Sequence, residues 1–437
     1  MFERLFKFQE NKTTFGREVM AGCVTFMTMA YIIFVNPSIL GDAMGKGMVP
    51  ALIFATCLAA GITTICMGLF TNYPLALASG MGLNALLAYG VVLGMKVPWQ
   101  TAMGIVVIEG LIITILVLTN FREWVMDAIP LDLKRAIGVG IGLFIALIGL
   151  KDANLVVADP VTLITFGKLT AQSLIALAGI FIIAVLMGKQ VKGSILIGIA
   201  FSTILAVLAG LVDLPKGSWV TGIRPEYFQT FFALDLKGAL SWGLAATIFA
   251  FLITDFFDTM GTVFAIGEEA GFVGKDGKLP RLKKVLLVDS LAAVVGGLFG
   301  CSSVTTYVES ASGVGEGGRT GLTSVVTGLL FLLAIFFTPL VGIVPTYAVA
   351  PALIIVGFLM LTAVKHMHWD DFSTAFPAFL TMVMIPFTYN ISKGIGYGFI
   401  SYVLIKVVSG KHKEVHPLMY LVSAAFVLDF FLTSIGK

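Results

Sequence analysis

Residues 300–321 read GCSSVTTYVESASGVGEGGRTG and interrupt the otherwise apolar second half of the chain. The first part, Val304–Val308, is rich in β-branched residues, and Glu309 follows it directly. Four glycines then fall within six residues, 313–318. Glycine and β-branched residues weaken a helix, and unpaired backbone at membrane depth survives only where protein or a watery cavity satisfies it. The stretch therefore predicts a short strand and a half-helix enclosed by protein.

The same pattern occurs once in the first half, at residues 72–90, NYPLALASGMGLNALLAYG. Pro74 opens this run, and Ser79 with two glycines interrupts it before good helix formers resume. Each interrupted segment is the third apolar run of its half, which is the pattern of an inverted-repeat transporter with broken helices at the membrane midplane. Two glycine-rich packing helices are the alternative. They account for the glycines but not for Glu309.

The composition of the whole chain indicates a membrane protein. Of its 437 residues, 58% are hydrophobic and only 12% are charged, whereas about a quarter of a soluble domain is charged. The apolar runs reach about 17–22 residues, enough to cross a hydrocarbon core of about 30 Å at about 1.5 Å per residue. We expect an all-α polytopic protein with the lipid bilayer around it. The net charge of +3 is too small for a nucleic-acid partner.

The apolar runs divide into two sets around a polar connector, residues 213–239. The first set has seven runs, near 19–40, 50–71, 75–94, 99–119, 133–151, 172–188 and 193–212. The second set has eight, near 240–267, 285–300, 301–318, 320–340, 347–364, 375–390, 394–410 and 417–435. One run too many means that 375–390 or 394–410 is short or spans only partly. We expect about 14 transmembrane segments in two inverted seven-segment repeats, 1–212 and 240–437.

Basic residues near the ends of the runs predict the orientation, because they are retained in the cytoplasm. Residues 1–18 are polar and the first apolar run has spanning length, so it predicts an uncleaved anchor rather than a signal peptide. An inside N-terminus also places the later basic loops inside. The basic residues on that side are Arg4, Lys7, Lys12, Arg17, Arg122, Lys134, Arg135, Lys189, Lys192, Lys275, Lys278, Arg281, Lys283 and Lys284. We expect a multi-pass plasma-membrane protein with a cytoplasmic N-terminus.

Ionisable side chains inside a span cost about 2.5–3.5 kcal/mol each on insertion scales, so each needs a partner or a purpose. All candidates here are acidic, and no Lys, Arg or His lies deep in a run, so a buried ion pair cannot explain them. They are Glu109, Asp255, Asp258, Asp289, Glu309 and Asp429. The four cysteines lie in apolar runs without metal-ligand spacing and are expected to be packing residues. No metal site is expected.

The acids differ in their local sequence. Asp255 and Asp258 are three residues apart, which places them on roughly one helical face with nearby threonines. Asp289 lies in a run that is otherwise apolar. Glu309 begins a half-helix, where free backbone N–H groups and a partial positive charge would stabilise it. The alternatives are that Glu309 is only a helix cap and that Asp255 only bonds neighbouring helices.

Carboxylates and a half-helix N-terminus together predict the kind of ligand. Carboxylates accept hydrogen bonds from N–H donors, and a helix N-terminus offers N–H groups to carbonyl or ring acceptors. A flat heterocycle such as guanine or hypoxanthine presents both edges. Aromatic side chains near the acids could stack on its ring: Phe256, Phe257, Phe264 and Tyr307. A buried carboxyl can also take up a proton, since low dielectric disfavours its charged form. Sodium coupling stays open.

Four motifs carry a family resemblance: FMTMAYIIFVNPSIL (26–40), NYPLALASGMGLNA (72–85), FDTMGT (257–262) and TYVESASGVGEGGRTGLTSV (306–325). At these motifs the chain resembles the nucleobase:cation symporters of the nucleobase–ascorbate transporter type, and within them the azaguanine-resistance-like adenine/guanine/hypoxanthine permeases. The resemblance implies two inverted repeats, a core domain of segments one to four and eight to eleven, and a gate domain of the others. It also implies purine uptake with protons by alternating access.

The resemblance also implies the site. An acid on the eighth segment and one at the start of the tenth would bind the base, and they fall on Asp258 and Glu309. Further substrate contacts are expected at Ala78, Ser79, Val308, Ser310, Thr262 and Thr25. The bacterial uracil branch has a histidine where this chain has Thr262, so proton coupling is expected to depend on carboxyls: Asp258, Glu309, Asp289 and Asp255. No cofactor is expected, and the coupling ion is expected to be a proton.

Other functions are less well supported. An anion or other small-solute transporter on the same fold is the nearest alternative, but an anion site should not carry two carboxylates without a cation beside them. No nucleophile–base or metal constellation supports an intramembrane enzyme. The residues do not decide adenine against guanine and hypoxanthine. They do not decide the oligomeric state either, and a homodimer is one state that they allow.

Overall fold

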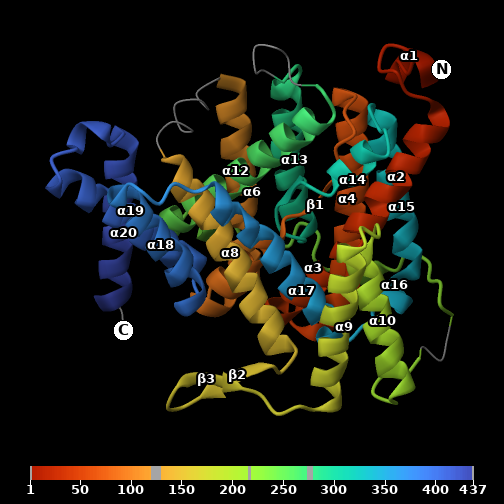
Figure 1. Cartoon of the computed structure of the whole chain (residues 1–437), viewed down its shortest axis with the longest axis horizontal. Helices are drawn as coiled ribbons and strands as arrows, with labels where there is room; N and C mark the ends of the chain where they lie inside the picture. The colour runs from red at the N-terminus through yellow and green to blue at the C-terminus, as the bar shows by residue number, and fades with distance from the viewer. Residues whose placement is uncertain (1, 120–128, 215–217, 273–278, 436–437) are drawn as a thin grey trace.

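The computed structural model of the chain describes residues 2–119, 129–214, 218–272 and 279–435. The expected loop residues Arg122, Lys275 and Lys278, and the side chains of Arg4 and Asp429, lie outside this part. Within it, nine helices are long and apolar enough to cross a membrane, and four shorter apolar helices accompany them. The helices form one bundle (Figure 1), which confirms the all-α polytopic fold.

The first half contains, in chain order, α1 (Phe2–Phe6), α2 (Phe15–Met29), α3 (Ile32–Met44), η1 (Lys46–Met48), α4 (Val49–Thr71), β1 (Leu77–Ser79), α5 (Met81–Ala85), the π-helix η2 (Leu86–Gly94), α6 (Trp99–Thr119), α8 (Leu131–Asp152), β2 (Val156–Asp159), β3 (Leu163–Phe166), α9 (Ala171–Gly188) and α10 (Ser194–Leu208). The first expected span is thus two helices. At their junction the backbone changes to short-range bonds, in which Ile33 N–H donates to Ala30 and Phe34 N–H to Tyr31.

The remaining elements are η3 (Pro225–Phe228), α11 (Leu236–Ala239), η4 (Trp242–Leu244), α12 (Ala245–Glu269), α13 (Leu282–Phe299), β4 (Val304–Thr306), α14 (Ser310–Gly315), α15 (Gly321–Ala334), η5 (Ile335–Phe337), α16 (Thr338–Val341), α17 (Thr346–Leu361), η6 (Thr362–His366), α18 (Phe372–Phe387), α19 (Ile391–Val408), η7 (His412–Glu414) and α20 (Pro417–Ile435). Of the two runs that the sequence leaves as short or partly spanning, 375–390 and 394–410, the shorter helix is α18. It has 16 residues and two internal prolines, and it is one of the shorter apolar helices, whereas α19 has spanning length.

The two halves pack on one another in a reciprocal way. The second segment of the first half, α4, packs on the fourth segment of the second half, α15. In turn α13, the second segment of the second half, packs on α6, the fourth of the first half. The third segments meet through β1 and β4, which pair antiparallel with Ala78 opposite Thr305. This exchange of equivalent partners is what an inverted repeat produces.

The small β1–β4 sheet is fully buried, so its outward-facing backbone groups need partners. The Thr64 hydroxyl of α4 donates to the Leu77 carbonyl at 2.9 Å and accepts from the Leu77 amide at 2.8 Å. The Ser79 hydroxyl donates to the Cys301 carbonyl at 2.7 Å. Both interrupted segments are therefore an extended strand followed by a helix, as the sequence predicts.

A second group of helices packs beside this sheet-containing part. It consists of α8, α9, α10, α17, α18 and α19, with α8 against α17 and α18. The α8–α17 crossing is so close that a Cβ on Gly357 would lie 2.4 Å from the Gly142 carbonyl oxygen. Only glycine permits this approach.

The polar connector is packed onto the bundle. Rings of η3 contact Phe54 of α4, with Tyr227 at 5.6 Å and Phe228 at 5.0 Å between centroids. Asp235 caps α11 and accepts from the Thr101 hydroxyl of α6 at 3.0 Å. The Gly238 amide and this hydroxyl hold the pKa of Asp235 below its usual value. The connector thus packs across α4 and α6.

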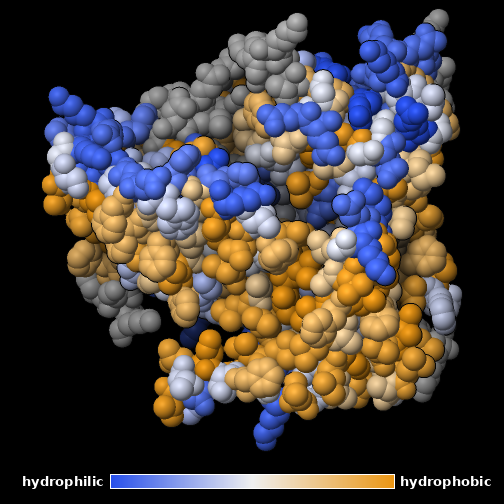
Figure 2. Space-filling model, in the orientation of Figure 1, coloured by the Kyte–Doolittle hydropathy of each residue, from blue (hydrophilic) through white to orange (hydrophobic). Residues whose placement is uncertain are grey.

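The surface separates polar from apolar residues. Figure 2 shows hydrophilic residues along the edge of the molecule where the N-terminus lies, above a broad apolar region. The β2–β3 hairpin projects at the opposite edge (Figure 1). An apolar belt below a polar rim is what a membrane-spanning protein requires.

Candidate functional site

A cavity of about 470 Å³ lies between α12, α5 and the first half of α8. This volume is within the range of about 300–1,000 Å³ that ligand pockets occupy. Its lining residues are Gly82, Leu83, Leu131, Lys134, Arg135, Ile137, Gly138, Ile141, Ile253, Thr254, Asp258, Met260, Gly261, Phe264 and Met360. Leu131, Lys134 and Arg135 form the first turn and a half of α8, which begins on the side where the N-terminus lies (Figure 1).

Asp258 is the carboxyl group of the cavity. It is exposed in the middle of α12, and Thr254 and Gly261 of the same helix face line the wall beside it. Phe264 lies about a turn and a half further along and presents an aromatic ring to the same space. Thr262 is half-buried and does not line the cavity, and the side chain of Phe257 lies outside the described part. The cavity therefore offers an acceptor, an aromatic face and an apolar wall, and the cations Lys134 and Arg135 also line it.

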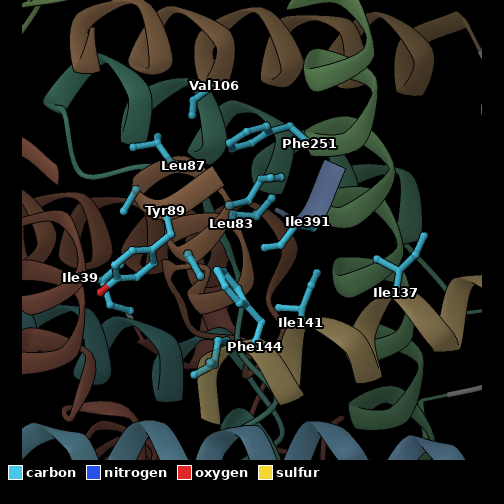
Figure 3. Close-up of a cluster of buried hydrophobic side chains, with 14 of the residues drawn as sticks. Ile39, Leu83, Leu87, Tyr89, Val106, Ile137, Ile141, Phe144, Phe251 and Ile391 are labelled. Carbon is cyan, nitrogen blue, oxygen red and sulfur yellow. The ribbon is translucent and has the colours of Figure 1, made fainter. Parts of the chain in front are cut away.

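Aromatic rings pack behind two residues of the cavity wall. Leu83 and Ile141 line the cavity and belong to one buried apolar cluster with Tyr89 and Phe144 (Figure 3). Phe144 packs edge-to-face on Tyr89 at 6.1 Å and on Tyr389 at 4.9 Å between centroids. The Tyr89 hydroxyl donates to Asp42 at 2.8 Å. Rings from η2, α8 and the α18–α19 turn thus pack into one cluster next to the cavity wall.

Glu309 stands at the N-cap position of α14, but its side chain makes no capping hydrogen bond. The Tyr31 hydroxyl instead donates to Glu309 Oε1 at 2.5 Å, and the Thr28 hydroxyl reaches the Glu309 carbonyl at 3.5 Å. Glu309 is half-buried and is not among the cavity-lining residues. Tyr31 was not predicted as a site residue. Its sequence position, a single tyrosine within the first apolar run, gives no indication of this contact.

Asp289 holds strand β4. Its Oδ1 accepts from the Thr306 amide at 2.9 Å and the Thr306 hydroxyl at 2.7 Å. Its Oδ2 accepts from the Thr259 hydroxyl at 2.6 Å. Both oxygens are therefore occupied, and Asp289 joins α13, α12 and β4 behind the cavity wall.

Asp255 and Asp258 face different surroundings. Asp255 is buried and accepts from the Ser303 hydroxyl at 3.4 Å, while Asp258 faces the cavity. The sequence analysis placed both on roughly one face. Three residues turn a helix by about 300°, so the two side chains point about 60° apart. In a tightly packed bundle this angle is enough to put one acid in a cavity and the other against a neighbouring helix.

The other expected contacts lie mostly at the junction of the two interrupted segments. Ala78 pairs with Thr305 in the sheet. The Ser79 carbonyl accepts from the Tyr307 hydroxyl at 2.5 Å, and Ser310 Oγ donates to the Tyr307 carbonyl at 2.7 Å. Tyr307 thus links the two segments and does not stack freely.

Two expected contacts remain. Val308, just before α14, is 56% exposed. The Thr25 hydroxyl is buried without a hydrogen-bond partner and lies against Gly313 of α14, where a Cβ would meet it. The structure therefore groups Ala78, Ser79 and Ser310 around the sheet, and it places Thr25 against α14.

The sequence model of the permease family, which includes xanthine and uracil permeases, matches residues 16–397. The chain belongs to this family. The adenine permease AdeP of Escherichia coli is 44% identical to it, over 98% of this chain and 95% of that protein. The guanine/hypoxanthine permease PbuG of Bacillus subtilis is 44% identical, over 97% and 98%. A putative permease of Methanocaldococcus jannaschii is 48% identical, over 98% of both. Purine permeases of the family are thus among the relatives of this chain, as the resemblance implied.

Solved structures share the fold. The transmembrane domain of the cyanobacterial bicarbonate transporter BicA superposes with a TM-score of 0.64 at 16% identity, over 87% of this chain and 96% of that one. The murine anion transporter Slc26a9 in its inward-facing state gives 0.65 at 11% identity, over 90% and 69%. At such low identity the likeness concerns the fold alone. It confirms the inverted-repeat architecture of this permease.

Proposed function

We propose that this permease imports purine nucleobases together with protons by alternating access. The observation that carries the proposal is the cavity whose wall presents Asp258, an aromatic ring and apolar side chains. Permeases named for adenine and for guanine/hypoxanthine at 44% identity support the choice of a purine. A purine ring can stack on Phe264 and donate an N–H to Asp258.

Glu309 would complete the base site. Its carboxyl group now accepts from Tyr31, so a base N–H would share or replace that hydrogen bond. The backbone around Ala78–Ser79 and Val308–Ser310 lies at the same junction and would supply amide groups to the base acceptors. Binding would then join the two interrupted segments to the cavity wall.

Alternating access would come from two bodies. The core would be α2–α6 with α12–α16, and the gate α8–α10 with α17–α20. The cavity wall draws on both, with Leu83 and Asp258 from the core and Leu131, Ile141 and Met360 from the gate. If the N-terminal side is cytoplasmic, as the basic residues there indicate, the cavity faces inward. Movement of the gate would then separate Phe144 from Tyr89 and open the opposite side.

Asp258 is the coupling residue in this scheme. It reaches the cavity, so a proton can exchange with water there, and a neutral carboxyl and a charged one differ in what they accept from a base. Asp258→Asn fixes the neutral form. We expect this variant to lose accumulation of base driven by a pH gradient, while its remaining base binding becomes much less dependent on pH.

The test is uptake of radiolabelled adenine, guanine and hypoxanthine into proteoliposomes under an imposed pH gradient, with proton flux followed alongside. The wild type should take up at least one purine with protons, and uracil and sulfate should compete poorly. Uptake driven by sodium without proton flux would overturn the coupling. Uptake of bicarbonate or sulfate in place of purine would overturn the substrate.

A further inference from the structure

A pair of carboxyl groups lies behind the cavity wall, between α6 and α12. Glu109 is completely buried, and neither of its oxygens has a hydrogen-bond partner. Asp255 is 1% exposed, and its Oδ1 has no partner either. The helices that carry them, α6 and α12, pack on one another, and the two side chains are close enough to interact directly. Two groups that can only accept when ionised are thus directed at each other.

The charged groups that act on Glu109, among the described residues, are acidic. Its helix, α6, packs against α12, α13, α11 and η2. α12 contributes Asp255 and Asp258, and α13 contributes Asp289, which already accepts from threonine donors. α13 also carries Lys283 and Lys284 in its first turn. Lys283 donates to the Leu118 carbonyl at 3.3 Å, about two and a half turns along α6 from Glu109. Charged residues of α11 lie near Thr101, about two turns from Glu109, and η2 has none. Within the described part no acidic, His or Cys cluster is arranged to hold a metal ion.

The electrostatic repulsion between the two carboxyl groups favours a proton between them. Two like charges in contact and out of water repel strongly, and buried acceptors without donors each lose a hydrogen bond. A single proton reduces both costs, because it removes one of the two charges and lets the protonated carboxyl donate to the other. Such a pair titrates as a unit.

We propose that Glu109 and Asp255 hold one proton between them, and that this proton stays in the protein while a base is transported. Neither side chain lines the cavity. The α6–α13 packing beside them is tight, since a Cβ on Gly110 would lie 2.9 Å from the Val294 amide nitrogen. α12 contacts both α6 and β4. The shared proton therefore bonds α6 to α12 and is distinct from any proton on Asp258.

The hydrogen bond between Glu109 and Asp255 also affects the cavity wall that carries Asp258. Asp255 lies one turn before Asp258, and its other oxygen accepts from Ser303, which precedes β4. With Glu109 protonated against it, Asp255 is fixed toward α6 and Ser303. Glu109 is thus a positioning residue for the wall that carries Asp258.

Infrared spectroscopy of the purified protein in lipid tests the site without any transport. A protonated carboxyl absorbs apart from carboxylates and shifts in D₂O. Wild type should show such a band at neutral pH, and both Glu109→Gln and Asp255→Asn should lose it, because the new amide donates to the remaining carboxylate. Asp258→Asn is the control and should keep the band. Retention of the full band in both pair variants would overturn the proposal.

The second half of the proposal rests on proton-coupled transport and needs its own readout. Glu109→Gln keeps a donor to Asp255, so we expect purine uptake within about threefold of wild type, a difference below one net hydrogen bond. Its ratio of protons to base should equal that of wild type. Base uptake without protons would show that the pair carries the transported proton. If Glu109→Gln does not fold, the infrared comparison of Asp255→Asn with Asp258→Asn decides whether the pair holds the proton.

Discussion

Asp258 and Asp255 are the same residue type, one turn apart on α12, in opposite surroundings. Asp258 stands in the wall of an open cavity, whereas Asp255 is enclosed with Glu109, and Asp289 lies behind the same wall. The difference teaches that membrane depth alone does not make a carboxyl functional. Access to water separates a group that can exchange protons from groups that hold the scaffold together.

The largest effect is expected from Asp289, on the enclosed side. Asp289→Ala would leave the Thr306 amide and hydroxyl without an acceptor, at about 1–3 kcal/mol for each buried group. We expect a loss of about 2–6 kcal/mol of stability on this basis, visible as a lower thermal unfolding temperature. Asp289→Asn keeps one oxygen for Thr306 and should lose much less. Equal stability of the alanine variant and wild type would contradict a structural role.

On the binding side, Glu309→Gln turns one acceptor oxygen into a donor that would face the base N–H. A hydrogen bond to a charged group is worth about 1.5–3 kcal/mol, so purine affinity should fall by about 10- to 150-fold. Equilibrium binding of labelled purine measures this. Glu316→Gln, an exposed acid on the same segment, is the matched control. If Glu309→Gln binds purine with wild-type affinity, Glu309 does not contact the base and only accepts the hydrogen bond from Tyr31.

Asp371, a carboxylate outside the membrane-spanning segments, is the comparison for the buried acids because it stays ionised at neutral pH. Hydrogen bonds from Ser373 hold the pKa of Asp371 at about 2, where it caps α18. Because the folded pKa is lowered, its stabilisation is present above the unfolded value of about 4 and is lost as pH falls toward 2. Asp371→Ala should cost about 0.5–2 kcal/mol at neutral pH and abolish this acid dependence in thermal unfolding. An unchanged acid dependence would be the contrary result.

The smallest effect is expected from Tyr31→Phe, which removes the hydroxyl bound to Glu309. A base would no longer compete with it, so affinity should rise by about 2- to 10-fold, the value of one net hydrogen bond. The same binding assay measures it. Weaker binding would show that Tyr31 holds the carboxyl in its working position.

The sequence predicts the broken segments because glycine, β-branched residues and Glu309 have no place in a lipid-facing helix. It also predicts that 375–390 or 394–410 is short, and the shorter helix is α18, which has two internal prolines. The Tyr31–Glu309 bond was not predictable, because its partners are 278 residues apart and a tyrosine in an apolar run carries no signal of its own. The separation of Asp255 from Asp258 depends on which helices surround α12. Periodicity does not contain that information.

The two strands also set the order in which the protein can be made. The Ser79 carbonyl meets the Tyr307 hydroxyl, 228 residues later, and α4 receives its partner α15 only after that. Until the second half has been synthesised, the extended backbone of residues 77–79 has no strand to pair with, and open backbone is costly in lipid. We expect the first half expressed alone, residues 1–212, to be degraded rapidly, and co-expression of residues 213–437 to rescue it. Insertion into the membrane and completion of the fold are thus separate events in time, divided by the synthesis of half the chain.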